Sequence, residues 1–224
     1  MIRARHATTT PRVPSEAPLD CALCPRLAGF LADARSREPT WHNAPVRSFG
    51  VPNARLLIVG LAPGLKGANR TGRPFTGDFA GDLLYATLDA FKFSQGTFAA
   101  SPDDGLQLID CMVTNAVRCV PPENKPTPAE INTCRQFLAA RIASLPDLVA
   151  IVALGRIAHE STLTALGARK SAFPFGHGAR HDVRPDLALF DSYHCSRYNT
   201  NTRVLTPEMF RAVFAAVRDH LDGA

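Results

Sequence analysis

The chain has 224 residues, of which 46% are hydrophobic and 20% charged, so it can form one domain with a complete core and is too apolar for a disordered chain. It contains no run of 18 apolar residues, which excludes a membrane-spanning helix of the usual length. Its net charge of +5 favours a polyanion as partner, although many proteins with such a charge bind no nucleic acid.

The N-terminal segment is rich in Thr, Pro and Arg, a composition typical of a loose tail. It also lacks the apolar stretch of a secretory signal. We therefore expect a flexible tail over residues 1–18 and a single domain over residues 19–224, in a cytoplasmic protein that has no membrane partner.

Four short apolar runs predict buried strands, at residues 55–60, 111–116, 149–154 and 187–192. Helical patterns lie between these runs and after the last one. Thr127 and Glu130 form a capping box that predicts a helix start, and Thr206 followed by Pro207 predicts another. The alternation of strands and helices predicts an α/β protein with a parallel sheet covered on both faces.

Ligands of such sheets bind beyond the carboxyl ends of the strands. The loop after the first predicted strand, residues 60–78, contains five glycines, which allow the backbone to approach a ligand closely. Gly64 is the glycine that we expect to bind the substrate. Asp78 is either the N-cap of the next helix or a functional carboxylate, and Phe75 is either a core residue or a stacking platform.

Polar residues also follow the second and fourth predicted strands. Asn115 can either read the edge of a base or satisfy loop backbone. His194 comes directly after the fourth strand, where an imidazole could stabilise negative charge that develops on a leaving group. His159, His177 and His181 compete with it for that role.

The cysteines form a tight pair and a wide pair. Cys21 and Cys24 are separated by two residues, and Cys119 and Cys134 by fourteen, whereas Cys111 lies inside a predicted strand and is expected in the core. Without a secretory signal, metal ligands or core thiols are favoured over disulfides. Four thiolates suit an iron–sulfur cluster or zinc, and the spacing alone does not choose between them.

Taken together, four ordered stretches resemble the iron–sulfur uracil-DNA glycosylases, in particular their type B (family 5) branch. The stretches are residues 21–24 (CALC), 60–78 (GLAPGLKGANRTGRPFTGD), 114–134 (TNAVRCVPPENKPTPAEINTC) and 192–202 (SYHCSRYNTNT). The resemblance implies a three-layer α/β/α sandwich with a four-stranded parallel central sheet. It also implies a monofunctional DNA glycosylase that hydrolyses the N-glycosidic bond of uracil and other deaminated bases, with hypoxanthine and xanthine as candidates.

The resemblance further implies roles for single residues. A [4Fe–4S] cluster would be held by Cys21, Cys24, Cys119 and Cys134. Phe75 would stack on the extruded base, Asn115 would meet its polar edge, and His194 would face the uracil O2. Asp78 would support the oxocarbenium-like sugar or position water. The loop after His194 would press into DNA through Ser196 and Arg197.

Two positions bear on the branch. The type A branch carries Glu where this chain has Leu61, which favours type B, and type B proteins usually carry Pro where this chain has Cys195. The resemblance implies a nucleoid-associated monomer that acts on double-stranded DNA, with single-stranded DNA as a further partner. The alternatives are a non-catalytic DNA-binding damage sensor with a structural iron–sulfur cluster and, ranked last, a zinc or iron–sulfur redox protein.

Overall fold

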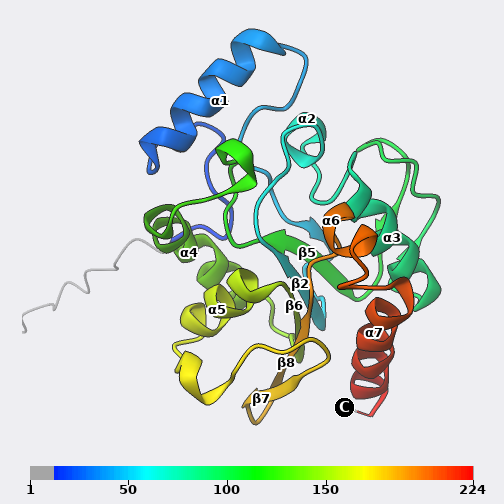
Figure 1. The fold of residues 1–224 in the computed structure, drawn as a ribbon. Coiled ribbons are helices and arrows are strands. Elements are labelled where there is room, and N and C mark those ends of the chain that lie inside the picture. The colour runs from blue at the N-terminus through cyan, green and yellow to red at the C-terminus, as the bar shows by residue number, and fades with distance from the viewer. Residues whose placement is uncertain (1–12, 224) are drawn as a thin grey trace, which may run out of the picture.

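The computed structural model describes residues 13–223, and a six-stranded mixed sheet lies at its centre, in the order β1-β5-β2-β6-β8-β7 (Figure 1). The four inner strands are parallel to one another and buried along their whole length. They are β5 (Cys111–Asn115), β2 (Leu56–Gly60), β6 (Ala150–Leu154) and β8 (Leu187–Ser192). The prediction of a four-stranded parallel sheet is therefore confirmed for this inner part.

Two antiparallel strands extend the sheet at its edges and were not predicted. The strand β1 (Phe49–Gly50) pairs with β5, and β7 (Arg180–Arg184) pairs with β8. The first has only two residues, and the second alternates between exposed and half-buried positions, so neither produces an apolar run in the sequence.

Helices cover both faces of the sheet, which confirms the predicted three-layer sandwich (Figure 1). On one face, α3 (Phe79–Ala90) and α7 (Pro207–Asp222) bury apolar side chains in a common core with β2, β5, β6 and β8. On the other face, α4 (Pro128–Ala143) and α5 (Arg156–Ala165) do the same.

The predicted helix starts are confirmed by their capping bonds. The hydroxyl of Thr127 accepts a bond from the Glu130 N–H at 3.3 Å, and the Glu130 carboxylate accepts one from the Thr127 N–H at 2.7 Å. Thr206 caps α7 by accepting from the Met209 N–H at 3.2 Å. These bonds satisfy N–H groups that have no partner inside the helix.

A third, smaller core lies beside the sandwich under α1 (Pro25–Arg37), which packs through Leu27 and Leu31. The remaining elements are short. They are α2 (Ala68–Thr71), α6 (Arg197–Asn201), the hairpin strands β3 (Ser94–Gln95) and β4 (Gln107–Leu108), and the 3-10 turns Pro122–Asn124 and Lys170–Ala172. Among the described residues, no helix is both long and apolar enough to cross a membrane.

The predicted boundary of the tail at residue 18 is wrong. Ala17 is buried in the core under α1, and the Glu16 carboxylate forms ion pairs with Arg118 and Arg141. Charge pairing and apolar burial thus hold residues 16 and 17 to the domain, which begins earlier than the composition indicated. The rest of the predicted tail, residues 1–12, lies outside the described residues.

Candidate active site and cysteine cluster

A cavity of about 550 Å³ lies where β2, β5 and β8 end, and it is lined by all seven residues that the sequence analysis assigned to substrate and DNA. They come from the glycine-rich loop, the end of β5 and the segment after β8. They are Gly64, Phe75, Asp78, Asn115, His194, Ser196 and Arg197. The carboxyl ends of neighbouring parallel strands meet at one edge of the sheet, which is why segments distant in sequence converge here.

Asp78 is both the N-cap of α3 and part of the cavity wall. Its carboxylate accepts a bond from the Gly81 N–H at 3.3 Å, so the interpretation as a cap is confirmed. A Cβ atom at Gly64 would lie 3.0 Å from the second carboxylate oxygen of Asp78, and one at Gly67 would overlap it. Burial raises the pKa of Asp78 above its usual value. The glycines therefore let the loop close around a partly desolvated carboxylate.

Phe75 belongs to the apolar core and also faces the cavity. It is 7% exposed and has a left-handed backbone, with φ of 51°. A Cβ atom at Gly60 would overlap the Phe75 ring and the Asn115 side chain, so only glycine fits at the end of β2. The core interpretation of Phe75 is therefore confirmed, and its role as a stacking platform stays a prediction.

Asn115 presents a buried amide whose Oδ1 atom has no hydrogen-bond partner among the described residues. Leaving a buried polar atom unpaired costs about 1–3 kcal/mol, which a ligand that pairs with it can recover. This unpaired atom in the wall of the cavity favours a polar ligand.

His194 follows β8 and is held without any charged partner. Burial lowers its pKa to about 4, so the imidazole is neutral at physiological pH. The Asn199 amide donates a hydrogen bond to the His194 carbonyl at 2.8 Å. The buried Cys195 thiol donates to the Ala80 carbonyl at 3.5 Å. Cys195 therefore anchors the loop after β8 to α3. A proline at this position would instead stiffen the loop.

Ser196 and Arg197 line the cavity, and their predicted contact with DNA stays a prediction. The Ser196 hydroxyl caps α6 by accepting from the Asn199 N–H at 3.3 Å. The Arg197 guanidinium lies 5.4 Å from the centroid of the Phe79 ring. Next to it, the Tyr198 ring is 74% exposed. A cation and an exposed aromatic ring beside a cavity suit contact with a nucleic acid.

Cys21, Cys24, Cys119 and Cys134 line one small cavity between α1 and α4. No three of these sulfur atoms lie within 4.8 Å of one another. Four sulfurs that hold a single zinc ion, with bonds of about 2.3 Å, would be only about 3.8 Å apart. Burial and the neighbouring thiols raise the pKa of Cys119 and Cys134, the latter to about 11. As thiolates, these side chains require a compensating positive charge.

The predicted core role of Cys111 is confirmed, since this residue is fully buried in β5 and its thiol donates to the Phe93 carbonyl at 3.3 Å. His159, His177 and His181 do not line the large cavity. His177 instead accepts a bond from the Tyr193 N–H at 3.1 Å.

Asn124 is a polar residue of the cavity wall that the sequence analysis did not assign to the site. It lies in the loop between Cys119 and Cys134, where Glu123 and Asn124 both have left-handed backbones, with φ of 55° and 57°. Arg26 on α1 donates to the Lys125 carbonyl at 3.1 Å and thereby holds this loop. In the sequence, only Pro121, Pro122 and Asn124 indicated a turn here. None of these residues indicated that the turn lies next to the cavity.

Residues 47–218, which include most of the sandwich and all the residues assigned to the cavity, match the family model described as "Uracil DNA glycosylase superfamily". The chain therefore belongs to this superfamily, and the recognition made from its motifs is confirmed. Within the superfamily it is similar to proteins named type-5 uracil-DNA glycosylase. The protein from Thermus thermophilus is 47% identical over 86% of this chain and 90% of the relative.

Two further relatives carry the same name. The protein from Mycobacterium bovis is 40% identical over 87% of this chain and 75% of the relative, and the one from Pyrobaculum aerophilum is 36% identical over 87% and 86%. A protein from Sulfurisphaera tokodaii named type-4 uracil-DNA glycosylase is 29% identical over 73% of this chain.

Proposed function

We propose that this protein is a monofunctional DNA glycosylase that hydrolyses the N-glycosidic bond of uracil in DNA and leaves an abasic site. The observation that carries the proposal is that Phe75, Asp78, Asn115 and His194 line one cavity. A base inside a duplex cannot reach such a cavity, so the nucleotide must leave the stack, at a cost of a few kcal/mol.

Phe75 and Asn115 recognise the extruded base in this proposal. The Phe75 ring offers an apolar face for stacking, and the Asn115 amide offers the unpaired buried Oδ1 to a polar edge of the base. The cavity of about 550 Å³ has room for a bicyclic purine as well as a pyrimidine, which supports hypoxanthine and xanthine as further substrates.

His194 and Asp78 act on the bond that breaks. As the C1′–N1 bond opens, its electron pair moves onto the uracil ring, and the neutral His194 imidazole donates a hydrogen bond to O2, where part of that charge collects. The ionised Asp78 carboxylate faces the positive charge that develops on the sugar and orients the water that adds to C1′. The released proton passes to the carboxylate or to the uracil anion.

No lysine is among the described residues that line the cavity, and a Schiff base with the sugar requires an amine. We therefore expect base removal without cleavage of the strand. Ser196, Arg197 and the exposed Tyr198 would contact DNA at the mouth of the cavity. We propose a monomer that acts on chromosomal double-stranded DNA, with single-stranded DNA as a further substrate.

Cys21, Cys24, Cys119 and Cys134 would hold a [4Fe–4S] cluster. The donor set fits, because four thiols converge on one cavity while their sulfurs are too far apart for one zinc ion. When bound, the cluster would supply positive charge to the thiolates and tie α1 to α4. The Arg118 N–H, 3.3 Å from the Cys134 sulfur, would stabilise that thiolate.

The experiment is to incubate the cluster-containing protein with a uracil-containing duplex and to measure abasic product after alkali treatment. Uracil release, at least 100-fold slower in His194→Ala, supports the proposal. Binding of the duplex with no abasic product at enzyme excess would instead indicate a damage sensor. Parallel duplexes with hypoxanthine and xanthine test the wider substrate range.

A further inference from the structure

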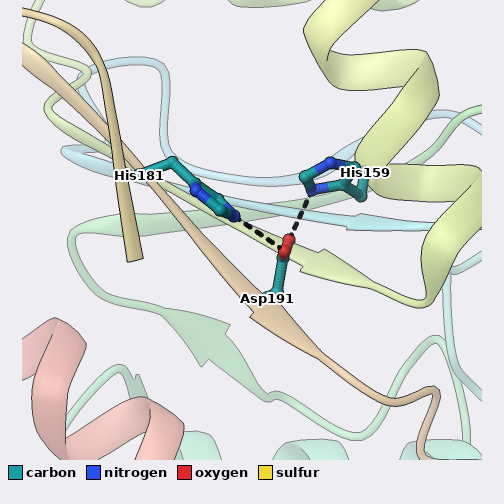
Figure 2. Close-up of side chains that lie close together, drawn as sticks. All are labelled: His159, His181 and Asp191. Carbon is teal, nitrogen blue, oxygen red and sulfur yellow. Dashed lines mark hydrogen bonds and ion pairs between the residues drawn. The ribbon is translucent and has the colours of Figure 1, made fainter. Parts of the chain in front are cut away.

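Three side chains from three elements meet on the face of the sheet that α5 covers, remote from the cysteine cavity in sequence and in contacts (Figure 2). His159 lies on α5, His181 on β7 and Asp191 on β8. The His159 Nδ1 is 2.7 Å from one carboxylate oxygen of Asp191, and the His181 Nε2 is 3.1 Å from the other. One ligand atom from each residue lies within 4.8 Å of those of the other two.

The contacts of His159 require positive charge at its Nδ1, either a second ring proton or a metal ion. Its Nε2 lies 2.9 Å from the Phe173 carbonyl, which can only accept a hydrogen bond, so this nitrogen carries a hydrogen. In a neutral imidazole the Nδ1 is then a bare lone pair, yet it faces the Asp191 carboxylate at 2.7 Å. Two acceptors at this distance repel each other unless a proton or a metal ion lies between them.

The outer contacts are those of a metal site. Histidines that bind metals usually donate the other ring N–H to a carbonyl or a carboxylate, as His159 does to Phe173. Ligating carboxylates are usually hydrogen-bonded in turn, and the Asp191 carboxylate accepts a bond from the Gly176 N–H at 3.3 Å. Asp191 is fully buried, so its charge has no compensation from water.

We propose that His159, His181 and Asp191 form a binding site for a divalent transition metal ion of the zinc class. Two imidazole nitrogens and one carboxylate oxygen are a ligand set that zinc accepts, with water in the fourth position. Ligands at about 2.0–2.2 Å from a tetrahedral ion are about 3.3–3.6 Å apart. Binding therefore requires the 2.7 Å contact of His159 with Asp191 to open by about 0.6–0.9 Å and the 3.1 Å contact of His181 with Asp191 by about 0.2–0.5 Å.

The edge strand can provide the movement of His181. His181 sits on β7, which pairs with β8 on one side only, and its side chain is 11% exposed, which gives the ion and its water an entry. An ion here would join α5, β7 and β8. It would fix the segment before β7, where His177 stacks on Tyr193 next to His194. The site is therefore structural and lies outside the catalytic cavity.

The experiment uses the full chain with its iron–sulfur cluster, treated with a mild chelator and then with one equivalent of Zn²⁺. Zinc retained after gel filtration is measured by elemental analysis, and its ligands by X-ray absorption. His181→Ala removes one ligand, and His220→Ala is the matched control. His220 is also half-buried and packs on Phe190 of β8, but it does not touch the three-residue site.

We expect wild type and His220→Ala to retain about one zinc per chain more than His181→Ala, with nitrogen and oxygen neighbours at about 2.0–2.2 Å. Zinc should also raise the melting temperature of these two proteins and not that of His181→Ala. Equal zinc content in all three proteins, or sulfur neighbours at about 2.3 Å, would overturn the proposal and leave a protonated His159 as the cation. Unchanged visible absorption of the cluster checks that each variant is folded.

Discussion

The Phe75 ring lies against the His194 imidazole, with ring centroids 6.1 Å apart and an angle of 28° between the planes. This contact joins the glycine-rich loop to the segment after β8 and places an apolar face beside a neutral hydrogen-bond donor. In the proposed function, a base that stacks on Phe75 would lie close to the His194 imidazole. The proposed base binding by Phe75 and the proposed charge stabilisation by His194 therefore belong to different side chains. Separate variants can test each function.

His194→Ala should lower kcat by about 10²–10³, because it removes a donor that acts on charge present mainly in the transition state. Affinity for uracil-containing DNA should change little. Single-turnover rates and fluorescence anisotropy measure the two quantities. His220→Ala, a histidine outside the cavity, should keep the wild-type rate. A loss of affinity with an unchanged rate would contradict the assigned role of His194.

Asp78 caps the N-terminus of α3 and also presents a carboxylate to the cavity. Two substitutions separate the capping function from the function of the charge. Asp78→Asn keeps a good N-cap and removes the charge, so it should lose most of the rate while the free energy of unfolding stays close to that of wild type. Asp78→Ala should lose the rate and about 1 kcal/mol of stability as well. Urea unfolding and the rate of base release provide the measurements. Equal destabilisation by both variants would mean that the charge, not the cap, stabilises α3.

The half-buried His194 gives rise to a prediction of how stability depends on pH. Its pKa is about 4 in the folded protein and about 6.5 when unfolded, so between these values the unfolded chain binds the extra proton. Stability should therefore fall as pH decreases from 6.5 to 4, by at most about 1.4 kcal/mol per pH unit from this group, and partial exposure reduces that slope. His194→Gln should have a shallower decline over this window in urea titrations. Parallel curves would mean that folding does not lower the pKa of His194.

Iron content tests the ligand set. Cys119→Ser should lose the cluster and its absorption near about 400 nm, while Cys111→Ser should keep both. Cys111 is a sound control because its thiol already donates to a carbonyl, a bond that serine can reproduce. Since the core under α1 is separate from the two cores of the sheet, loss of the cluster should expose α1 to proteolysis first. Full iron content in Cys119→Ser would contradict this ligand set.

The inner strands were predictable because each is buried on both faces and therefore reads as an apolar run. The edge strands were not, since β7 exposes every second residue and β1 is too short to form a pattern. The extent of the tail was also misjudged. From composition alone, Glu16 is a polar residue of the tail. Its ion pair with Arg118 forms only because the fold brings together two residues that are 102 positions apart in the sequence.

The cavity-lining position was predictable for residues at or just beyond the carboxyl end of a strand, as Asn115 and His194 are. Asn124 could not be found in this way, because its position depends on two successive left-handed residues. Arg73 shows the same limit. It lies in the glycine-rich loop but is 5% exposed, paired with Asp104 at 2.7 Å and covered by three aromatic rings. The charge of a side chain alone does not reveal that it is buried.

Tyr198 provides a test of how the enzyme opens a duplex. The ring is 74% exposed, follows Arg197 and lies in the helix that Ser196 caps, so it is held rigidly at the mouth of the cavity. An exposed aromatic ring in that position can replace the stacking that a duplex loses when a base is extruded, worth about 1–3 kcal/mol. Tyr198→Ala should therefore slow uracil release from a duplex by about 5–160-fold. Release from single-stranded DNA should slow much less, because little stacking is lost there. Tyr198→Phe keeps the ring and should retain the wild-type rate on both substrates. If Tyr198→Ala instead slowed release from duplex and single-stranded DNA equally, the ring would bind DNA without helping to open the duplex.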